Sequence, residues 1–453
     1  MKKMNFHLLI FTIIISFCCF QSKAQTVTDT IGNTIVEISV AVDTNHFTGG
    51  YFSGPWDIFW GPDQKLWYTN ETRLCTYDPA THIVDTILQI DSGFIMSVAT
   101  HHDFQNNPFV YLAIDSAYYY AAGNNIQVYK YDYSLTGDSL YNPQFILDWY
   151  HGGEHSGGRI LFGDDNKLYV ATAEYFSQFD TLFNNSGKVL RVNPDGSVPI
   201  DNPRADYTFT YGHRNPQGIV QTPNGNLIVS EYGMQYDEVN LLEAGRFYGW
   251  WIYDGDSCFN NSDSCDYYDS IAVFPIDVGR NPASGIDFYN NAAIPEFNGL
   301  IQAVTGFNQG LIAYTMNATY DSVLVKTFYL TSEYGRVRDV CAAPDGSVYF
   351  IAHDRNRADI HVIRNPLFNN IKNESNLDFS IFPNPANENL NIINFKANKN
   401  SSISIFNSIG KIVYQDDNFN GESIDVGRFP DGVYFVKCFA DEMIEVERVV
   451  VCH

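Results

Sequence analysis

The chain has 453 residues, with 52 acidic and 27 basic side chains and a formal net charge of −25. This length exceeds one compact core and allows one large domain with a smaller one. The charge excludes attraction to nucleic acid or anionic lipid, because phosphates need basic partners. Aromatic residues make up 15% of the chain, which is typical of a folded protein rather than a disordered one.

Residues 1–24 predict a secretory signal peptide. Two lysines precede an apolar run at 8–20, and a small-x-small cleavage signature follows at 22–24. The run is too short for a convincing membrane span. We therefore expect the mature protein to begin near Gln25, outside the cytoplasm and without a transmembrane segment. The cysteine pair at 18–19 leaves a lipoprotein signal open as an alternative.

The middle of the chain repeats one design of turn and strand. A turn of Pro, Asp, Asn and Gly residues leads into an alternating apolar strand at 61–69, 163–172, 222–231 and 343–352. Such turns are typical of hairpin tips. Imperfect recurrence at these distances favours radial repetition of blades, as in a β-propeller.

One loop combines a cation with a close backbone approach. Residues 211–218 (YGHRNPQG) place Arg214 in a turn, and Gly233 follows in a second turn before the acidic pair Asp237 and Glu238. A guanidinium on a glycine-rich loop suggests an anion site. The alternative is a structural loop whose arginine binds carbonyl groups.

The stretch 211–251 resembles the soluble glucose/sorbosone dehydrogenase family. Further blocks with the same resemblance follow the same order at 103–114, 154–172, 187–203, 281–289 and 336–352. The resemblance implies an all-β fold, a six-bladed β-propeller over residues 25–368. It also implies oxidation of a sugar with pyrroloquinoline quinone (PQQ) and Ca²⁺.

The resemblance also implies catalytic residues. His155 matches the general base that takes the C1 hydroxyl proton, and Glu154, in the place of an aspartate, would orient it. A neutral imidazole suits that task near neutral pH. Arg214 would stabilise charge that develops on the quinone.

Further matches concern the cofactor. Asn215, Arg336, Arg338 and Asn308 fall at positions that contact PQQ. Arg336 and Arg338 alternate across Val337, so we expect both side chains on one face of a strand. The alternative for each arginine is a salt bridge between blades.

The metal and the sugar have their own candidate residues. The resemblance implies that main-chain oxygens of Gly233 and Met234 bind Ca²⁺, with Glu238 as a weaker candidate. Asp237 and, more weakly, Ser92 are candidates for sugar contact.

Some positions depart from the family pattern. Ser92 replaces a Gln or Glu near the sugar, Asn308 replaces a lysine found in well-known members, and Glu174 stands where a Gly-Asp pair is usual. These changes leave open a non-catalytic propeller that binds glycan or protein on the same face. The sequence HGGEH at 151–155 fits an inverted zinc motif, but its glycines oppose the helix that such a site needs. The chain shows no signature of a propeller hydrolase.

Eight cysteines include the two in the signal peptide. Cys258 and Cys265 lie in the polar loop 254–269, where a local disulfide is expected outside the cytoplasm. The other four cannot be paired from the sequence: Cys75, Cys341, Cys438 and Cys452.

The C-terminal part predicts a separate module. A polar linker at 369–376 precedes residues 377–453, which read as short antiparallel strands of a small β-sandwich. Their FPNP and GVY motifs resemble the type A sorting domain of the type IX secretion system. That resemblance implies export by this machinery, with the protein secreted or attached to the cell surface. The alternative is a carbohydrate-binding β-sandwich.

The favoured interpretation is an exported dehydrogenase that oxidises an aldose or oligosaccharide at C1 to the lactone. Its expected partners are the sugar and an external electron acceptor.

Overall fold

The computed structural model describes residues 26–44, 54–116, 125–134, 138–151, 155–175, 184–259, 262–306, 310–353, 358–368, 380–393, 401–407, 411–420, 423–440 and 443–453. The chain divides into two compact units, Met1–Leu367 and Phe368–His453. The predicted signal peptide at 1–24 and linker at 369–376 lie outside the described residues. Among the helices in these ranges, none is long and apolar enough to cross a membrane.

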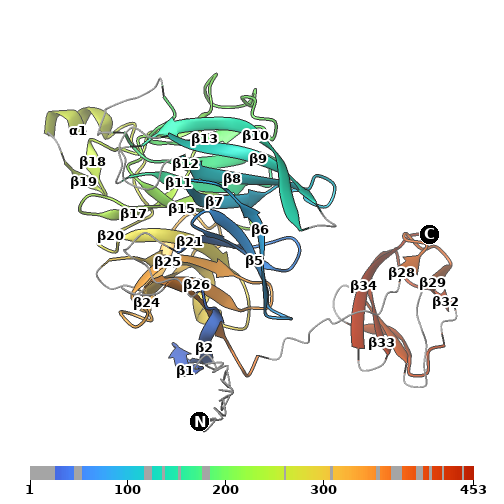
Figure 1. Ribbon diagram of the computed structural model, residues 1–453. Coiled ribbons are helices and arrows are strands. Elements are labelled where there is room, and N and C mark those ends of the chain that lie inside the picture. The colour runs from blue at the N-terminus through green and yellow to red at the C-terminus, as the bar shows by residue number, and fades with distance from the viewer. Residues whose placement is uncertain are drawn as a thin grey trace, which may run out of the picture. The chain divides into compact units, whose positions relative to one another are not determined.

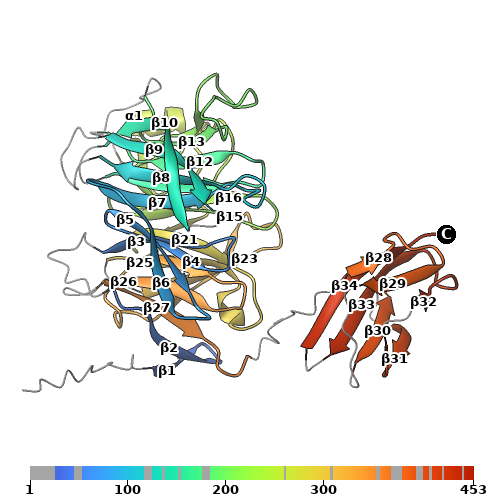
Figure 2. The same ribbon diagram turned by 45° about the vertical axis from the view of Figure 1, so that its right-hand side comes forward.

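The larger unit is a six-bladed β-propeller, as the sequence predicted. Six antiparallel sheets follow one another around a ring in the described residues (Figures 1 and 2). The innermost strands of successive blades are neighbours in the order β3, β7, β11, β15, β21 and β25, and β25 returns to β3.

The first three blades have four strands each. Blade 1 contains β3 (Pro55–Trp60), β4 (Leu66–Asn70), β5 (Arg73–Asp78) and β6 (Ile83–Gln89). Blade 2 contains β7 (Phe94–Thr100), β8 (Phe109–Asp115), β9 (Asn125–Ser134) and β10 (Ser139–Tyr150). Blade 3 contains β11 (Gly157–Phe162), β12 (Leu168–Thr172), β13 (Lys188–Val192) and β14 (Thr208–Tyr211).

The other three blades include a long excursion and the chain's N-terminal strands. Blade 4 contains β15 (Pro216–Gln221), β16 (Leu227–Glu231), β17 (Asp237–Leu241) and β20 (Asp277–Gly279). Between β17 and β20 lie β18 (Tyr253–Asp254), β19 (Ser257–Cys258) and α1 (Ser262–Tyr268). Blade 5 contains β21 (Ala283–Tyr289), the 3₁₀ helix η1 (Pro295–Phe297), β22 (Gly299–Val304), β23 (Gly310–Met316) and β24 (Val323–Tyr329). Blade 6 contains β25 (Arg336–Ala342), β26 (Val348–His353), β27 (Ala358–Arg364), β2 (Thr34–Val42) and β1 (Val27–Ile31).

The ring is closed by strands from opposite ends of the propeller sequence. In blade 6, β2 pairs with β27, so that Ile38 faces Ile363. Figure 1 shows these blue N-terminal strands beside the orange ones. Pairing removes the exposed edge that β27 would otherwise present.

The repeated turns connect the two innermost strands of their blades. In each turn the fourth residue donates its N–H to the carbonyl oxygen of the first, at 3.2 Å in blade 1 and 2.9–3.0 Å in blades 3, 4 and 6. That fourth residue has positive φ, as at Gln64 (61°), Asn166 (61°), Gly225 (90°) and Gly346 (87°). Asn and Gly tolerate this backbone conformation best, which explains the recurring composition of these turns.

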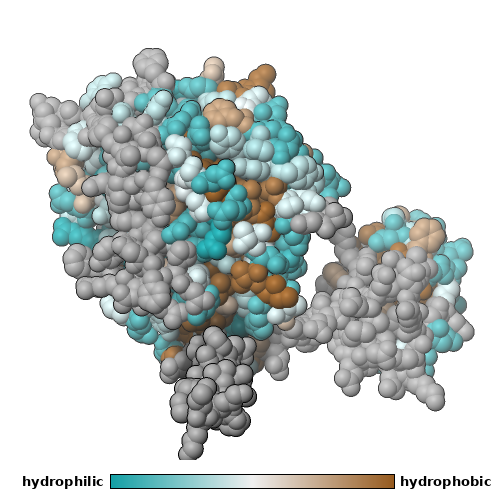
Figure 3. Space-filling view, in the orientation of Figure 1, coloured by the Kyte–Doolittle hydropathy of each residue, from teal (hydrophilic) through white to brown (hydrophobic). Residues whose placement is uncertain are grey.

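Apolar and aromatic side chains fill the spaces between blades. Trp56, Trp67 and Trp149 are almost fully buried, each in a cluster that joins neighbouring sheets. The visible described surface in Figure 3 is mostly hydrophilic, with smaller hydrophobic areas between. This distribution agrees with a chain that carries a net charge of −25.

The smaller unit is a separate β-sandwich, as expected. One sheet contains β28 (Ser380–Phe382), β29 (Asn389–Ile393) and β32 (Ile424–Asp425). The other contains β31 (Ile412–Asp416), β30 (Ser402–Asn407), β33 (Gly432–Ala440) and β34 (Met443–Val451). Ile403 and Ile405 are buried in the core between the sheets, whereas Ile412 and Val413 are exposed.

Candidate functional site

The candidate site lies at the mouth of the propeller where the innermost strands begin. Each innermost strand has a register shift within its first four residues, as between Gly157 and Arg159 or Pro216 and Gly218. Bulges of this kind bend a strand and re-aim its side chains, and they are frequent beside active sites. Because all six innermost strands have such a shift, the side chains around the mouth do not simply alternate between the two faces of each sheet.

A histidine and a glutamate form the central pair of the site. His155 precedes β11 and Glu174 follows β12, and His155 Nδ1 lies 3.1 Å from Glu174 Oε1. A carboxylate accepts hydrogen bonds, so Nδ1 carries a proton, and in the neutral ring Nε2 has the free lone pair. The His155 side chain is 20% exposed. The pair therefore presents a partly exposed imidazole that can accept a proton at Nε2.

Among the described residues, the carboxylate in contact with His155 Nδ1 is that of Glu174, and the role that we expected for Glu154 stays a prediction. Glu154 lies outside the described residues. The neighbouring segment contains no described helix: His151 follows β10, and His155 lies just before β11. Among the described residues, no three His, Cys, Asp or Glu side chains are grouped so as to hold a metal ion.

Glu174 also connects the pair to two other side chains. Trp250 Nε1 donates to Glu174 Oε2 at 2.6 Å, and Arg214 Nε lies 4.0 Å from Oε1. The backbone N–H of Glu174 donates to the carbonyl oxygen of Arg214 at 2.8 Å. Glu174 is thus the residue on which the histidine, the tryptophan and the arginine converge.

Arg214 lies in the turn before β15 and contacts the second turn predicted from the sequence. Its Nη1 donates to the carbonyl oxygens of Tyr232 at 2.9 Å and Gly233 at 2.7 Å. The guanidinium also lies over the rings of Tyr232 and Trp250, at 5.4 and 5.1 Å from their centroids. Two main-chain oxygens therefore converge on one cationic nitrogen.

Two carboxylates hold the turn after β16 by accepting hydrogen bonds from its backbone N–H groups. Asp254 accepts the N–H groups of Met234 at 3.0 Å and Gln235 at 2.8 Å, and Asp237 accepts that of Gly233 at 3.3 Å. A Cβ on Gly233 would lie 1.6 Å from the carbonyl oxygen of Tyr236, so only glycine fits. The turn directs its N–H groups inward and the carbonyl oxygen of Gly233 toward Arg214.

The two acidic residues of β17 belong to the hydrogen-bond network around this turn. Asp237 is buried, and burial raises the pKa of its carboxyl to about 6. Glu238 accepts hydrogen bonds from Asn240 Nδ2 at 2.9 Å and Gly255 N at 2.8 Å. Burial, and next the charge of Glu231, raise the pKa of Glu238 well above its usual value. These contacts favour a bracing role over the sugar or metal contacts that we expected.

The other predicted residues have different positions. The Asn215 carboxamide oxygen accepts from Gly157 N at 3.3 Å and joins the starts of β15 and β11. Ser92 is exposed in the loop before β7. Asn308 lies outside the described residues.

The expected alternation of Arg336 and Arg338 is wrong. The register of β25 shifts between Val337 and Asp339, so Arg338 is the extra residue of a bulge. Arg338 is buried, with its guanidinium carbon 3.7 Å from the ring centroid of Trp56, whereas Arg336 is half-buried. Both arginines still belong to the first residues of β25, at the same mouth as Arg214.

An ion-pair cluster lies deeper in the channel, and the sequence did not reveal it. Arg159 forms ion pairs with Asp57 and with Asp339, the latter at 2.6 Å, and thereby joins blades 1, 3 and 6. This cluster and later residues of the innermost strands, including Ile160, line a cavity of about 350 Å³. The cavity lining does not include His155, so the cavity is separate from the candidate site.

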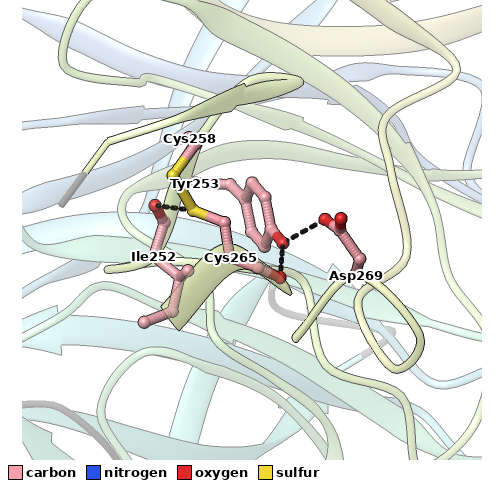
Figure 4. The surroundings of a disulfide bond; sticks show 5 residues. All are labelled: Ile252, Tyr253, Cys258, Cys265 and Asp269. Atoms are coloured by element: carbon pink, nitrogen blue, oxygen red, sulfur yellow. Dashed lines mark hydrogen bonds between the residues drawn. A yellow bond between two sulfur atoms is a disulfide. The ribbon is translucent and has the colours of Figure 1, made fainter. Parts of the chain in front are cut away.

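The excursion of blade 4 carries a disulfide. Cys258 and Cys265, the pair expected from the sequence, are joined (Figure 4). The Tyr253 hydroxyl lies between the Cys265 carbonyl oxygen, at 2.7 Å, and the Asp269 carboxylate. We call residues 249–259 and 262–274 the blade-4 cap.

Comparison with known proteins agrees with the propeller fold. Residues 52–362 match the Glucose / Sorbosone dehydrogenase family, and residues 380–452 match the Secretion system C-terminal sorting domain. Quinoprotein glucose dehydrogenase B of Acinetobacter calcoaceticus is 31% identical over 237 residues, which are 43% of this chain and 50% of that protein. Aldose sugar dehydrogenase YliI of Escherichia coli K12 is 28% identical over 218 residues, 45% of this chain and 58% of that protein. The matched region thus covers between half and two thirds of these relatives.

The fold has solved counterparts. The PQQ-bound form of aldose sugar dehydrogenase from Streptomyces coelicolor superposes with a TM-score of 0.58 at 22% identity, covering 73% of this chain and 98% of that one. At this identity the likeness concerns the fold. The family match spans most of the propeller and ends just before its last residues. The chain therefore belongs to the glucose/sorbosone dehydrogenase family and carries a type IX secretion sorting domain after its propeller.

Proposed function

We propose that this protein oxidises an aldose or oligosaccharide at C1 to the lactone, with PQQ and Ca²⁺. The observation that carries the proposal is the pairing of His155 with Glu174, at 3.1 Å, at the mouth of a sugar-dehydrogenase propeller. The reaction removes a proton from the C1 hydroxyl and a hydride from C1, which leaves the lactone carbonyl. When bound, PQQ supplies the two-electron acceptor, and an external acceptor then takes both electrons.

His155 accepts the hydroxyl proton at Nε2 in this proposal. Glu174 holds the proton of the ring on Nδ1 and stabilises the imidazolium that forms. Trp250 fixes Glu174 in turn through the hydrogen bond of 2.6 Å to Oε2. Glu174 therefore orients His155, and Trp250 orients Glu174. Because the imidazole is already in place, less conformational entropy is lost when the reaction takes place.

The residues at the mouth fit a planar polycarboxylate. PQQ is a flat quinone with three carboxylates, and Arg214, Arg336 and Arg338 supply three guanidinium groups at the first residues of β25 and the turn before β15. Guanidinium groups bind carboxylates with matched fork geometry. The rings of Tyr232 and Trp250, already in contact with Arg214, offer faces for stacking.

The donor set also fits a hard cation. The carbonyl oxygens of Tyr232 and Gly233 converge on Arg214 Nη1, which stands where a metal ion could be held. Ca²⁺ takes main-chain oxygens readily and needs further ligands, which the cofactor's own oxygens would complete. We expected Gly233 and Met234 as ligands; the converging pair includes Tyr232 instead.

The test is a reconstitution of the full chain. The purified protein is titrated with PQQ in excess Ca²⁺ while the cofactor absorbance is followed, and dye reduction is then measured with a panel of aldoses. We expect saturable PQQ binding, turnover that needs both additions, and loss of turnover but not of PQQ binding in His155→Ala. A folded protein that leaves the PQQ spectrum unchanged would refute the proposal and leave the non-catalytic binding propeller.

We also propose that the mature protein is secreted or attached to the cell surface. The support is the sorting domain at 380–452, since such a domain indicates export. Deletion of residues 377–453 should retain the propeller inside the cell envelope, and fractionation followed by immunoblotting measures this. Equal release of both forms would contradict the proposal.

A further inference from the structure

The blade-4 cap presents aromatic rings beside the candidate site. We propose that Trp251 and Phe259 form a subsite for a second sugar ring, so that the preferred substrate is an oligosaccharide whose reducing-end ring lies at His155. This inference rests on the proposed function and adds the substrate class.

The subsite is continuous with the catalytic pair. Trp250 donates to Glu174, the partner of His155, and its ring centroid lies 4.9 Å from that of Trp251. The ring centroid of Phe259 lies 5.3 Å from that of Trp251, with the two rings nearly perpendicular. It lies 6.2 Å from that of Trp250, with the two rings nearly parallel. A chain of direct contacts therefore leads from the base to the outer rings.

These rings remain partly exposed in the folded protein. Trp250, Trp251 and Phe259 are all half-buried, although each packs against the other two. Large aromatic side chains gathered at one solvent-accessible point mark binding surfaces more often than isolated apolar residues do. The cluster thus has ring surface left for a ligand.

A sugar suits this surface better than other small molecules. The faces of a pyranose ring carry C–H groups that pack on aromatic rings, while its edge hydroxyls remain available to water and polar groups. Within the cap, the residues next to Phe259 are polar or acidic, including the exposed Asp256 and Ser257. Anionic or purely apolar ligands would meet repulsion or lose hydration there.

A disulfide and a buried tyrosine brace the cap next to Phe259. The disulfide between Cys258 and Cys265 closes the loop next to Phe259, and Tyr253 is buried beneath it. The Tyr253 hydroxyl bonds the carbonyl oxygen of Cys265 and anchors α1 at 2.7 Å. A preformed surface binds more tightly because less conformational freedom is lost on binding.

The test compares one-ring and two-ring substrates in matched variants of the full chain. For Trp251→Ala and Phe259→Ala we expect the ratio of kcat/KM for cellobiose or maltose to kcat/KM for glucose to fall about tenfold, the order of one aromatic contact. Tyr267→Ala is the control, because Tyr267 belongs to the same cap but is 70% exposed on α1. Its ratio should stay at the wild-type value.

The outcomes separate this inference from the proposed function. A parallel loss for both substrates, or an unchanged ratio, would overturn the subsite. Calorimetric titration of the cofactor-free protein with longer cello- and malto-oligosaccharides adds a readout that needs no turnover. Binding that disappears in Trp251→Ala supports the subsite even if no dehydrogenase activity is found. If no dehydrogenase activity is found, the absence of binding to the wild-type protein would refute it.

Discussion

Replacing Glu174 with glutamine should disable the base while leaving its surroundings in place. Trp250 Nε1 can only donate, so the amide oxygen of Gln must face Trp250 and the amide NH₂ must face His155 Nδ1. Nδ1 then has to accept, and the ring proton moves to Nε2. The nitrogen that should take the substrate proton is no longer a base.

The expected loss in kcat/KM is about 10²- to 10⁴-fold, the usual contribution of a general base, or roughly 3–5 kcal/mol in activation free energy. The variant keeps the hydrogen bonds to Trp250 and to His155, although the one to His155 reverses its direction. The free energy of unfolding should therefore fall by only about 1 kcal/mol. If the role of Glu174 were only structural, the free energy of unfolding would fall strongly and kcat/KM would change little.

The assay combines kinetics with a direct view of the tautomer. Histidine labelled with ¹⁵N reports the protonated ring nitrogen by NMR in the cofactor-free protein, and the His155→Ala spectrum assigns the signal. Glu174→Asp is the matched control, because it keeps an acceptor and should keep Nδ1 protonated. The reasoning is refuted if Glu174→Gln retains wild-type kcat/KM, or if Nδ1 still carries the proton.

Three further predictions concern stability and metal binding. Arg159→Leu should cost about 3–5 kcal/mol in unfolding free energy by urea titration, because Asp57 and Asp339 are left buried without their cation. Burial raises the pKa of Asp287 to about 7; since the unfolded value is near 4, this carboxyl lowers stability as the pH rises from about 4 to 7, by up to about 4 kcal/mol. Asp287→Asn should therefore gain in melting temperature relative to the wild type over that pH range. Gly233→Ala should abolish Ca²⁺ and PQQ binding measured by calorimetry, since its Cβ would overlap a carbonyl oxygen at 1.6 Å.

Each of these has a control within the chain. Combining Arg159→Leu with Asp57→Asn and Asp339→Asn should recover stability, and failure to recover would contradict the ion-pair argument. Asp256→Asn, at an exposed position, should leave the pH profile unchanged. Met234→Ala should keep Ca²⁺ affinity, because it retains every main-chain atom.

The propeller could be predicted because its signals are local. Turns such as 163–166 and 343–346 carry the residues that positive φ requires, and each lies next to an alternating strand. Family blocks supplied the number of blades. The closure by β2 had no local signal, since its partner β27 lies more than 300 residues away in the sequence.

The site could be predicted only in part, because the argument for the residue that orients His155 stopped at its sequence neighbour. Glu154 was preferred for adjacency and stays untested, since it lies outside the described residues. Glu174 was missed: β11 and β12 are antiparallel with Gly157 opposite Thr172, and extending this register outward brings Glu174 opposite His155. Without the bulge between Gly157 and Arg159, the regular hairpin register would place Tyr175 opposite His155, so the sequence alone does not give the pair.

The remaining differences from the prediction also depend on geometry without a sequence signal. Simple alternation failed at Arg338 because a bulge adds one residue, and bulges have no clear composition here. Arg159 meets Asp57 and Asp339 across 102 and 180 residues of sequence, so their meeting follows from ring closure rather than from any motif.

The shared sixth blade also sets the order of assembly. The first propeller strand to leave a ribosome or a translocon has to wait until the last blade has emerged, because β2 finds its place only beside β27. Until then the ring of blades stays open. The unpaired edges of β2 and β27 can then pair with other strands. Such long-range pairing forms slowly. The ring therefore closes only once the last blade has been made, whatever the place in which the chain folds.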